Sequence, residues 1–324
     1  MEYNRIFSYA STSTFTLAFC LFLAGCTNPV IPDHTNLNDP KNSEAWHHSN
    51  APWTGRCSHA SVVYSDRIWV LGGSGQDGDM NDVWCFSDSS GWANICSPAP
   101  WHARWGHSAV VFDDKIWIMG GSDFSDVWAS KDGMNWSLAT NYASWGGRTS
   151  QAAVAFNGKI WIFGGIARGY EDWVYKNDVW SSTDGSTWVQ EADSAPWTGR
   201  AYHTVTEFNG KLWLIGGYNG GYLEDIWCSS DGIGWTQVDN KTSGLGRWGH
   251  AAAVFEDNIW IIGGCNYYSL NDIWYSSDGS NWTLLTTDCP WSDRAYHSAV
   301  YYKKSLWIMG GMQWSYLSDI WHCP

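Results

Sequence analysis

The sequence contains few charged residues, few basic ones in particular, and no apolar run long enough to cross a membrane. Asp, Glu, Lys and Arg make up 15% of the chain, and 32 acidic residues against 18 basic ones give a formal charge of −14. An acidic surface repels phosphate backbones and anionic lipid headgroups. The composition therefore argues against nucleic acid as a partner.

The longest apolar run lies near the N-terminus, from Thr14 to Leu23. It is too short to span a bilayer as a helix, which takes about 20 residues. It follows Arg5 and is closed by Ala24-Gly25-Cys26. Small residues directly before a cysteine resemble the lipobox of bacterial lipoproteins, whose cysteine receives lipid. An ordinary secretory signal is the alternative.

The lipobox resemblance implies a division of the chain into three parts. Residues 1–25 would be a signal peptide, and Cys26 would become the lipidated N-terminus. Residues 26–45 are polar and contain three prolines, which suits a flexible tether. We therefore expect an exported protein on the periplasmic or surface face of a bacterial envelope, which contacts the membrane only through its lipid.

Tryptophan is abundant, with 27 residues, and most of it belongs to a pattern that recurs six times from residue 46 onward. Each unit begins with an Arg, usually preceded by Trp-x-x and followed three residues later by His. An apolar run, a two-residue turn, Ile/Leu-Trp and Gly-Gly follow, and then Asp-Val/Ile-Trp. The arginines are Arg56, Arg104, Arg148, Arg200, Arg247 and Arg294. Their spacings of 48, 44, 52, 47 and 47 residues suit the blades of a β-propeller.

Each unit predicts four short antiparallel strands. Asn157-Gly158 and Asn209-Gly210 are strong hairpin turns, and Asp184-Gly185 predicts an outer hairpin. Runs such as Ile116 to Met119 do not alternate with polar residues, which is typical of strands covered on both faces. We predict an all-β, six-bladed propeller with most Trp side chains between the blades.

The sixth unit stops after its third strand, at Trp321-His322-Cys323-Pro324. The segment Ala45-Trp46-His47-His48 precedes the first strand of the first unit. We therefore expect it to supply the fourth strand of the last blade and to close the ring.

The Arg-x-x-His, Gly-Gly and spaced Trp pattern resembles kelch repeats over residues 46–324, including those of the central domain of galactose oxidase. The turn Ser276 to Trp282 also resembles a shortened Asp box of sialidase propellers. Kelch families include scaffolds, adhesion modules and some enzymes, so the resemblance leaves the function open. We predict a non-catalytic propeller of the cell envelope that recognises a glycan or a protein through aromatic side chains of its loops. The alternatives are a carbohydrate-active enzyme such as a sialic-acid mutarotase or sialidase, which the resemblance permits, and a structural scaffold of the envelope.

Residues outside the core pattern are the candidate ligand contacts. Aromatic side chains gather in the variable loops after Gly-Gly and beside the repeat arginines, and such side chains suit sugar faces or a protein hot spot. Packing of the loops against one another is the alternative. The predicted ligand-binding residues are Trp105, Tyr170, Trp173, Tyr175, Tyr218, Tyr222, Trp248, Tyr267, Tyr268, Trp314, Tyr316, Arg104 and Arg247.

The other recurring polar residues favour structural roles. Because the Arg and Asp of the pattern occur in every unit, we expect ties between strands, and an anion-binding ring is the alternative. The histidines, replaced by Gln151 in the third unit, favour packed and hydrogen-bonded side chains over a metal ring. We expect no catalytic residues, cofactor or metal, a monomer, and a disulfide between Cys85 and Cys96 across one outer hairpin.

Overall fold

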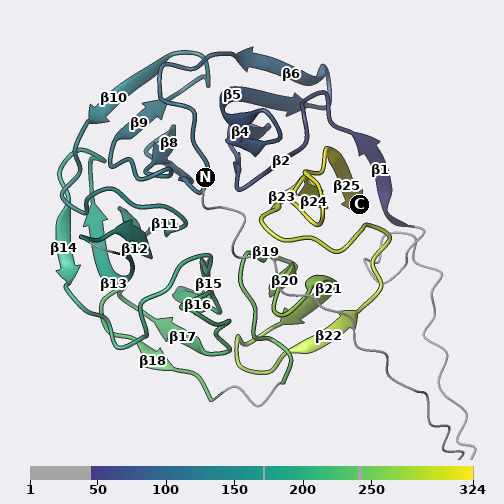
Figure 1. Cartoon of the computed structure of the whole chain (residues 1–324). Coiled ribbons are helices and arrows are strands. Elements are labelled where there is room, and N and C mark those ends of the chain that lie inside the picture. Colours follow the sequence, from purple (N-terminus) through teal and green to yellow (C-terminus); the bar gives the residue numbers. More distant parts are fainter. Residues whose placement is uncertain (1–44, 171, 240–242, 324) are drawn as a thin grey trace, which may run out of the picture. The chain divides into compact units, whose positions relative to one another are not determined.

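The computed structural model describes residues 45–170, 172–239 and 243–323, which form six antiparallel sheets around a central axis (Figure 1). The prediction of an all-β, six-bladed propeller with four strands per blade is confirmed. No helix in this part of the chain is long and apolar enough to cross a membrane. The predicted signal peptide, Cys26 and all of the tether except Ala45 lie outside the described residues. Ala45 itself is buried in a core cluster and belongs to the propeller.

The chain forms the blades in sequence order, with the first strand of each nearest the axis. Blade 1 holds β2 (Arg56–Cys57), β3 (Ala60–Val63), β4 (Ile68–Gly75), β5 (Gly78–Ser87) and β6 (Gly91–Cys96). Blade 2 holds β7 (Ser108–Phe112), β8 (Lys115–Met119), β9 (Val127–Ser130) and β10 (Trp136–Thr140). Blade 3 holds β11 (Ala152–Phe156), β12 (Lys159–Arg168), β13 (Trp173–Ser182) and β14 (Val189–Ala192).

The second half of the ring repeats this order. Blade 4 holds β15 (Thr204–Phe208), β16 (Lys211–Ile215), β17 (Ile226–Ser229) and β18 (Thr236–Gln237). Blade 5 holds β19 (Ala251–Phe255), β20 (Asn258–Cys265), β21 (Ser269–Ser276) and β22 (Thr283–Thr286). Blade 6 holds β23 (Ser298–Tyr302), β24 (Ser305–Met309), β25 (Asp319–Cys323) and β1 (His47–Asn50).

Strand β1 closes the ring as predicted. It pairs antiparallel with β25, with His47 opposite His322 and Asn50 opposite Asp319. Trp46, just before β1, packs edge-on against Trp291 with ring centroids 4.4 Å apart. The two ends of the described chain therefore complete one blade, and β1 gives it the fourth strand that the other blades also have.

The turns between the first two strands of the blades are tight even where the sequence is poor in glycine. Asn157 and Gly158 have φ of 48° and 71°, and Lys303 and Lys304 have φ of 47° and 66°. Two successive residues with positive φ form the turn type that matches the twist of an antiparallel hairpin. The twist of the strands thus imposes this conformation on residues that do not favour it.

Tryptophan rings and glycines hold the blades against one another. Trp117 of β8 is buried, and its indole Nε1 donates to the carbonyl of Phe112, 2.8 Å away. A Cβ at Gly185, in the outer turn of blade 3, would overlap this ring. The Asp-Gly turn of one blade therefore needs glycine because it lies on the tryptophan of the preceding blade.

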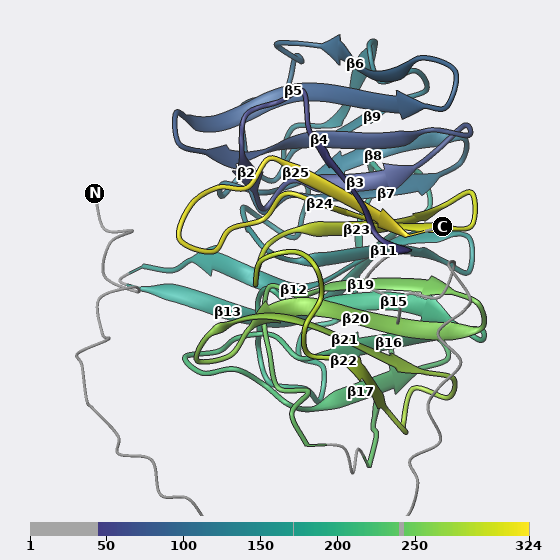
Figure 2. The same cartoon turned by 90° about the vertical axis from the view of Figure 1, so that its right-hand side faces the viewer.

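The predicted loops after Gly-Gly are partly strands. In blade 3, β12 and β13 continue to pair beyond a bulge as far as Arg168 opposite Trp173. Blades 1 and 5 have similar long hairpins, and Figure 2 shows β4–β5 and β12–β13 extending toward the same side. In all three blades the ladder shifts register at Gly-Gly and then resumes. We call this side, where the second strand of each blade ends and the repeat arginines lie, the mouth face.

Candidate binding site at the mouth of the propeller

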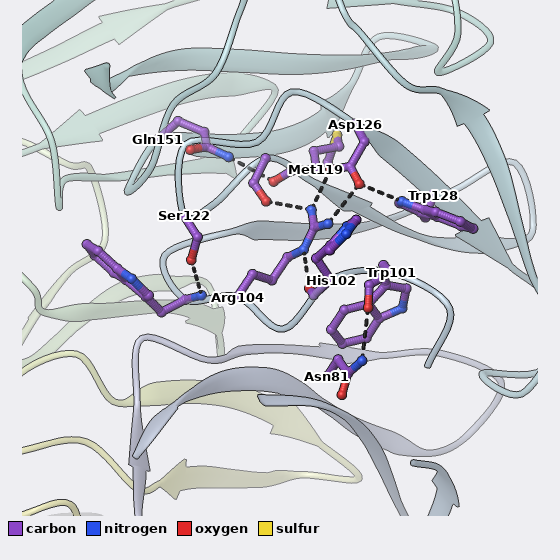
Figure 3. A network of polar contacts seen from close by, with 11 residues as sticks. Asn81, Trp101, His102, Arg104, Met119, Ser122, Asp126, Trp128 and Gln151 are labelled. Carbon is purple, nitrogen blue, oxygen red and sulfur yellow. Dashed lines mark hydrogen bonds and ion pairs between the residues drawn. The ribbon is translucent and has the colours of Figure 1, made fainter. Parts of the chain in front are cut away.

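The repeat arginines are buried ties. Arg104 is fully buried, and its guanidinium nitrogens Nη1 and Nη2 donate to the two carboxylate oxygens of Asp126 at 2.6 and 2.8 Å (Figure 3). Nη1 also donates to the carbonyl of Gly120 at 2.8 Å, and the indole of Trp128 donates to Asp126 at 2.8 Å. The same pairs recur in all six blades: Arg56–Asp82, Arg104–Asp126, Arg148–Asp178, Arg200–Asp225, Arg247–Asp272 and Arg294–Asp319.

This arrangement removes two residues from the predicted binding set. Arg104 and Arg247 are fully buried and bonded within their own blades, so neither guanidinium is available to a ligand. Burial raises the pKa of Asp126, but hydrogen bonds and the charge of Arg104 outweigh it and hold that pKa below its usual value. The pair is therefore ionised and mutually neutralised.

The backbone of each arginine also joins neighbouring blades. The Arg104 N–H donates to the carbonyl of Met80, and the Gly73 N–H donates to the carbonyl of Arg104, at 3.0 and 2.9 Å. Gly311 and Arg56 make the second of these bonds across the closure, at 2.9 Å. The arginine thus fixes both a blade and its contact with the preceding blade.

The histidine three residues after the arginine, present in five of the six blades, is a packing element. A Cβ on Gly73 would lie 2.7 Å from His59 Cβ, and a Cβ on Gly72 would lie 3.2 Å from the ring of His107 in the next blade. The Gly-Gly pair therefore leaves room for two histidines. Burial and the charge of Arg104 lower the pKa of His107 to about 3, so it is neutral at physiological pH.

Directly before the histidines, six residues form a closed ring of backbone hydrogen bonds around the axis. Each N–H donates to the carbonyl of the equivalent residue in the preceding blade, at 2.7–3.0 Å. All six have positive φ, between 52° and 61°. We call them the axial ring: Ser58, Gly106, Ser150, Tyr202, Gly249 and Tyr296.

An open cavity of about 130 Å³ lies on the axis, lined by the axial ring and by the residues that follow it. Its side chains differ from blade to blade. Blades 4 and 6 carry Arg-Ala-Tyr-His, with Tyr202 and Tyr296 in the ring, whereas blades 2 and 5 carry Arg-Trp-Gly-His, with Trp105 and Trp248 beside it. Four blades therefore each contribute one aromatic side chain near the axis.

Five aromatic side chains from blades 3 to 6 are in contact on one side of the mouth. The ring of Trp248 lies 5.4, 5.1 and 5.3 Å from those of Tyr202, Tyr218 and Tyr296. Tyr175, on β13, lies 6.0 Å from Tyr218. Tilted or edge-on angles of 49–70° make these rings a curved wall rather than a flat platform. We call Tyr175, Tyr202, Tyr218, Trp248 and Tyr296 the aromatic cluster.

The opposite side of the mouth carries small polar side chains. Ser58 and Ser150 belong to the axial ring, and Thr149 precedes Ser150. The Ser150 hydroxyl is buried and has no hydrogen-bond partner. Ser122 accepts a hydrogen bond from the Trp105 N–H at 3.0 Å (Figure 3). The mouth is thus asymmetric, because the aromatic cluster comes from blades 3 to 6, whereas blades 1 and 3 place Ser58 and Ser150 in the cavity lining.

The structure brings together only some of the predicted ligand contacts. Tyr175, Tyr218 and Trp248 belong to the aromatic cluster, and Trp105 lies next to the axial ring in blade 2. Tyr222 and Tyr267 form a separate edge-on pair with centroids 5.1 Å apart. The remaining aromatic residues lie outside the cluster, four of them exposed and Tyr316 half-buried: Tyr170, Trp173, Tyr268, Trp314 and Tyr316.

Sequence reasoning missed Tyr202 and Tyr296. Both lie in otherwise regular Arg-x-x-His segments, which the repeat pattern assigns to the core. The repeated tetrapeptide Arg-Ala-Tyr-His was the available signal, since a bulky residue follows Ala where the other blades have Gly or Ser.

The predicted disulfide is not formed in the structure. Cys85 and Cys96 are both free thiols, with Cys85 opposite Ala93 and Cys96 opposite Val83. Diagonal positions across two strands are about 7 Å apart or more, near or beyond the usual span of a disulfide. A bond between them would require a local shift of β6.

The described residues contain no cluster of three or more His, Cys, Asp or Glu side chains that could hold a metal ion.

Comparisons with known proteins support the propeller. Residues 131–247, just over a third of the chain, match the family described as "DUF6242 beta propeller domain". The solved structure titled "Structure of YjhT" is similar with a TM-score of 0.69 and 18% identity, over 84% of this chain and 94% of that one. A search of curated proteins finds no match. Because 818 solved chains are similar to this one, the likeness establishes the fold and leaves the function open.

Proposed function

We propose that this protein is a non-catalytic binding propeller of the cell envelope that recognises a glycan at its mouth. The observation that carries the proposal is the aromatic cluster beside an axial cavity that Ser58 and Ser150 also line. Aromatic rings contact the apolar faces of sugars, and hydroxyl groups exchange hydrogen bonds with sugar hydroxyls. Asymmetry also supports binding, because a purely structural position is expected to be the same in every blade.

The acids and bases near the axis favour binding over catalysis. A general acid or base works best with a pKa near the operating pH. Burial and Arg56 lower the pKa of His59 to about 3, and Asp82 is held ionised by Arg56. Neither group is suited to proton transfer near neutral pH. A sialidase-like site also needs arginines that can reach a carboxylate, and the six repeat arginines are buried.

We further propose that the repeats are of the kelch type and that the chain is exported and anchored through a lipid on Cys26. The recurring Arg-x-x-His and Gly-Gly support the first proposal, and the Leu-Ala-Gly-Cys sequence supports the second. Incorporation of labelled palmitate into the wild-type chain and not into a Cys26→Ser variant is the expected result. Equal labelling of both, or of neither, would contradict the lipid anchor.

The binding proposal is tested by screening the full-length protein on a glycan array with two single variants. Tyr218→Ala should weaken binding about tenfold or more, because it removes a half-buried ring that joins Tyr175 to Trp248 in the aromatic cluster. Tyr142→Ala is the matched control, since Tyr142 is 82% exposed and lies outside the aromatic cluster. It should bind as the wild type does.

A third variant distinguishes the mouth from the hairpin tips. Trp173→Ala with Trp314→Ala removes two exposed rings outside the aromatic cluster. Loss of binding in this double variant, with Tyr218→Ala unaffected, would contradict a site at the mouth. Absence of binding to any glycan, together with cross-linking of the mouth to a protein in cells, would favour a protein ligand instead.

A further inference from the structure

We infer that the glycan bound at the mouth is uncharged, and that the propeller rejects sugars carrying carboxylate or sulfate groups. This inference rests on the proposed function and adds the chemical class of the ligand. It follows from where the cationic side chains lie, how they are paired, and how the acidic side chains are distributed.

Six of the cations on the mouth face are unavailable. The repeat arginines are buried, and each donates two hydrogen bonds to its own aspartate, as Arg247 does to Asp272 at 2.6 and 2.9 Å. A ligand carboxylate would have to displace that aspartate to reach the guanidinium. Removing one partner of a buried ion pair is strongly unfavourable.

The remaining cations of the described chain lie mostly on the opposite face. Consecutive connections of an antiparallel meander alternate between its two ends. Basic residues at the turns away from the mouth are Arg67, Lys115, Lys131, Lys159, Lys211, Lys303 and Lys304. Several of these also pair with acids, for example Lys159 with Glu191 at 2.8 Å. They cannot contact a ligand held at the mouth.

Only two further cations of the described residues lie on the mouth face, and both belong to one hairpin. Arg168 ends β12, opposite Trp173, and Lys176 lies within β13. Lys176 is close enough to Asp178 to contribute to that carboxyl group's lowered pKa. Lys241, in the connection between blades 4 and 5, lies outside the described residues. Neither the axial ring nor the aromatic cluster contains a basic residue.

Acidic residues outnumber these two cations on the mouth face. Besides the six paired aspartates, exposed or half-buried acids there include Asp77, Asp79, Asp123, Asp172, Glu224 and Asp293. Their combined field repels an anionic ligand, and like charges brought together at an interface weaken binding strongly. Hydroxyl groups and aromatic rings suit a neutral sugar, which needs no counter-charge.

The test compares matched pairs of oligosaccharides that differ only in whether the terminal sugar is a neutral hexose or the corresponding hexuronate. We expect the full-length protein to bind the neutral member about tenfold more tightly or better. Binding of the neutral member should also be nearly independent of salt concentration, because it involves no ion pair.

A charge introduced at the mouth should relax this discrimination. Met312 lies beside Ala295 in blade 6, where the Ala295 N–H donates to its carbonyl at 3.0 Å. Met312→Lys should raise the relative affinity for the uronate member, with a gain that disappears at high salt. Met134→Lys is the matched control, because Met134 is 58% exposed in an outer turn on the opposite face and the change in net charge is identical. It should leave the preference unchanged.

The outcomes separate the two proposals. Equal or tighter binding of the uronate member, lost in Tyr218→Ala, would overturn the inference of an uncharged ligand and leave glycan binding at the mouth intact. No binding to either member of any pair would overturn both. We expect the protein to bind the neutral member more tightly. Tyr218→Ala should weaken this binding, and only Met312→Lys should reduce the preference for the neutral member.

Discussion

At the scale of single residues, the carboxylates of the Asp-Val/Ile-Trp segments complete a buried network. Asp126 accepts two hydrogen bonds from Arg104 and one from Trp128. Asp126→Asn would leave the buried guanidinium without its counter-charge. We expect it to lower the free energy of unfolding by about 3–5 kcal/mol, measured by urea denaturation.

The control for this change lies in the same blade. Asp113 is exposed and pairs with Lys115 at 3.3 Å, so Asp113→Asn should change stability by less than about 1 kcal/mol. Similar effects of the two substitutions would show that the Arg104–Asp126 pair does not hold the blade together.

The Arg–Asp pairs could be predicted because they recur in every unit. The axial tyrosines, Tyr202 and Tyr296, were missed because they lie inside the same recurring pattern. A residue type present in every blade indicates a structural tie, which the buried Arg–Asp pairs bear out. Tyr202 and Tyr296 sit at a position whose backbone has positive φ in all six blades. That conformation, set by the hydrogen bonds of the axial ring, places their side chains in the lining of the axial cavity. The repeated Arg-Ala-Tyr-His marks the two positions in the sequence, but it does not show which way the side chains turn.

At the scale of elements, strand β1 and the residue before it complete the last blade. Trp46 is buried and packs against Trp291. In four other blades the tryptophan near the start of the fourth strand packs in the same way against the tryptophan that precedes the repeat arginine, for example Trp92 against Trp53 at 4.5 Å. Trp46→Ala should lower the free energy of unfolding by about 3–5 kcal/mol, because it leaves a large cavity where the ring closes. Urea denaturation followed by Trp fluorescence measures the change.

Trp314→Ala is the matched control for this element, since Trp314 is 92% exposed. A loss of stability as large as that of Trp46→Ala would contradict a special role for the closure.

The closure was predictable because the sixth unit lacks a fourth strand and the segment before the first unit supplies one. The long hairpins of blades 1, 3 and 5 were not, because pairing beyond the Gly-Gly bulge depends on register, which the spacing of the repeats does not determine.

At the scale of the whole molecule, the buried histidines make stability depend on pH. In the unfolded chain a histidine binds its proton below about pH 6.5. In the folded protein, burial and neighbouring arginines lower the pKa of His59, His107 and His250 to about 3. The unfolded state therefore binds more protons between these values. The stabilisation is complete above about pH 6.5 and is lost as the pH falls toward about 3.

His107→Gln tests this dependence with a residue that the fold already accepts, because Gln151 occupies the same position in blade 3. The side-chain amide of Gln151 donates to the carbonyl of Met119 at 2.9 Å. Between pH 6 and pH 4 the free energy of unfolding should fall less steeply in the variant than in the wild type. The two slopes should differ by about 1.4 kcal/mol per pH unit, which is the contribution of one histidine. His102→Gln, at an exposed position, is the control. Parallel curves for wild type and His107→Gln, measured by urea denaturation at each pH, would refute the argument.

The axial ring is built entirely from main-chain N–H and C=O groups, and its six positions hold Ser, Gly, Ser, Tyr, Gly and Tyr. The main-chain atoms of these residues thus hold the blades together, while their side chains face the ligand proposed at the mouth. Exchange of side chains at the four positions that are not glycine can therefore alter the ligand while the bonds between blades stay in place, whereas a side chain at Gly106 would collide with Thr149. Such a mouth can diversify during evolution faster than the scaffold that carries it.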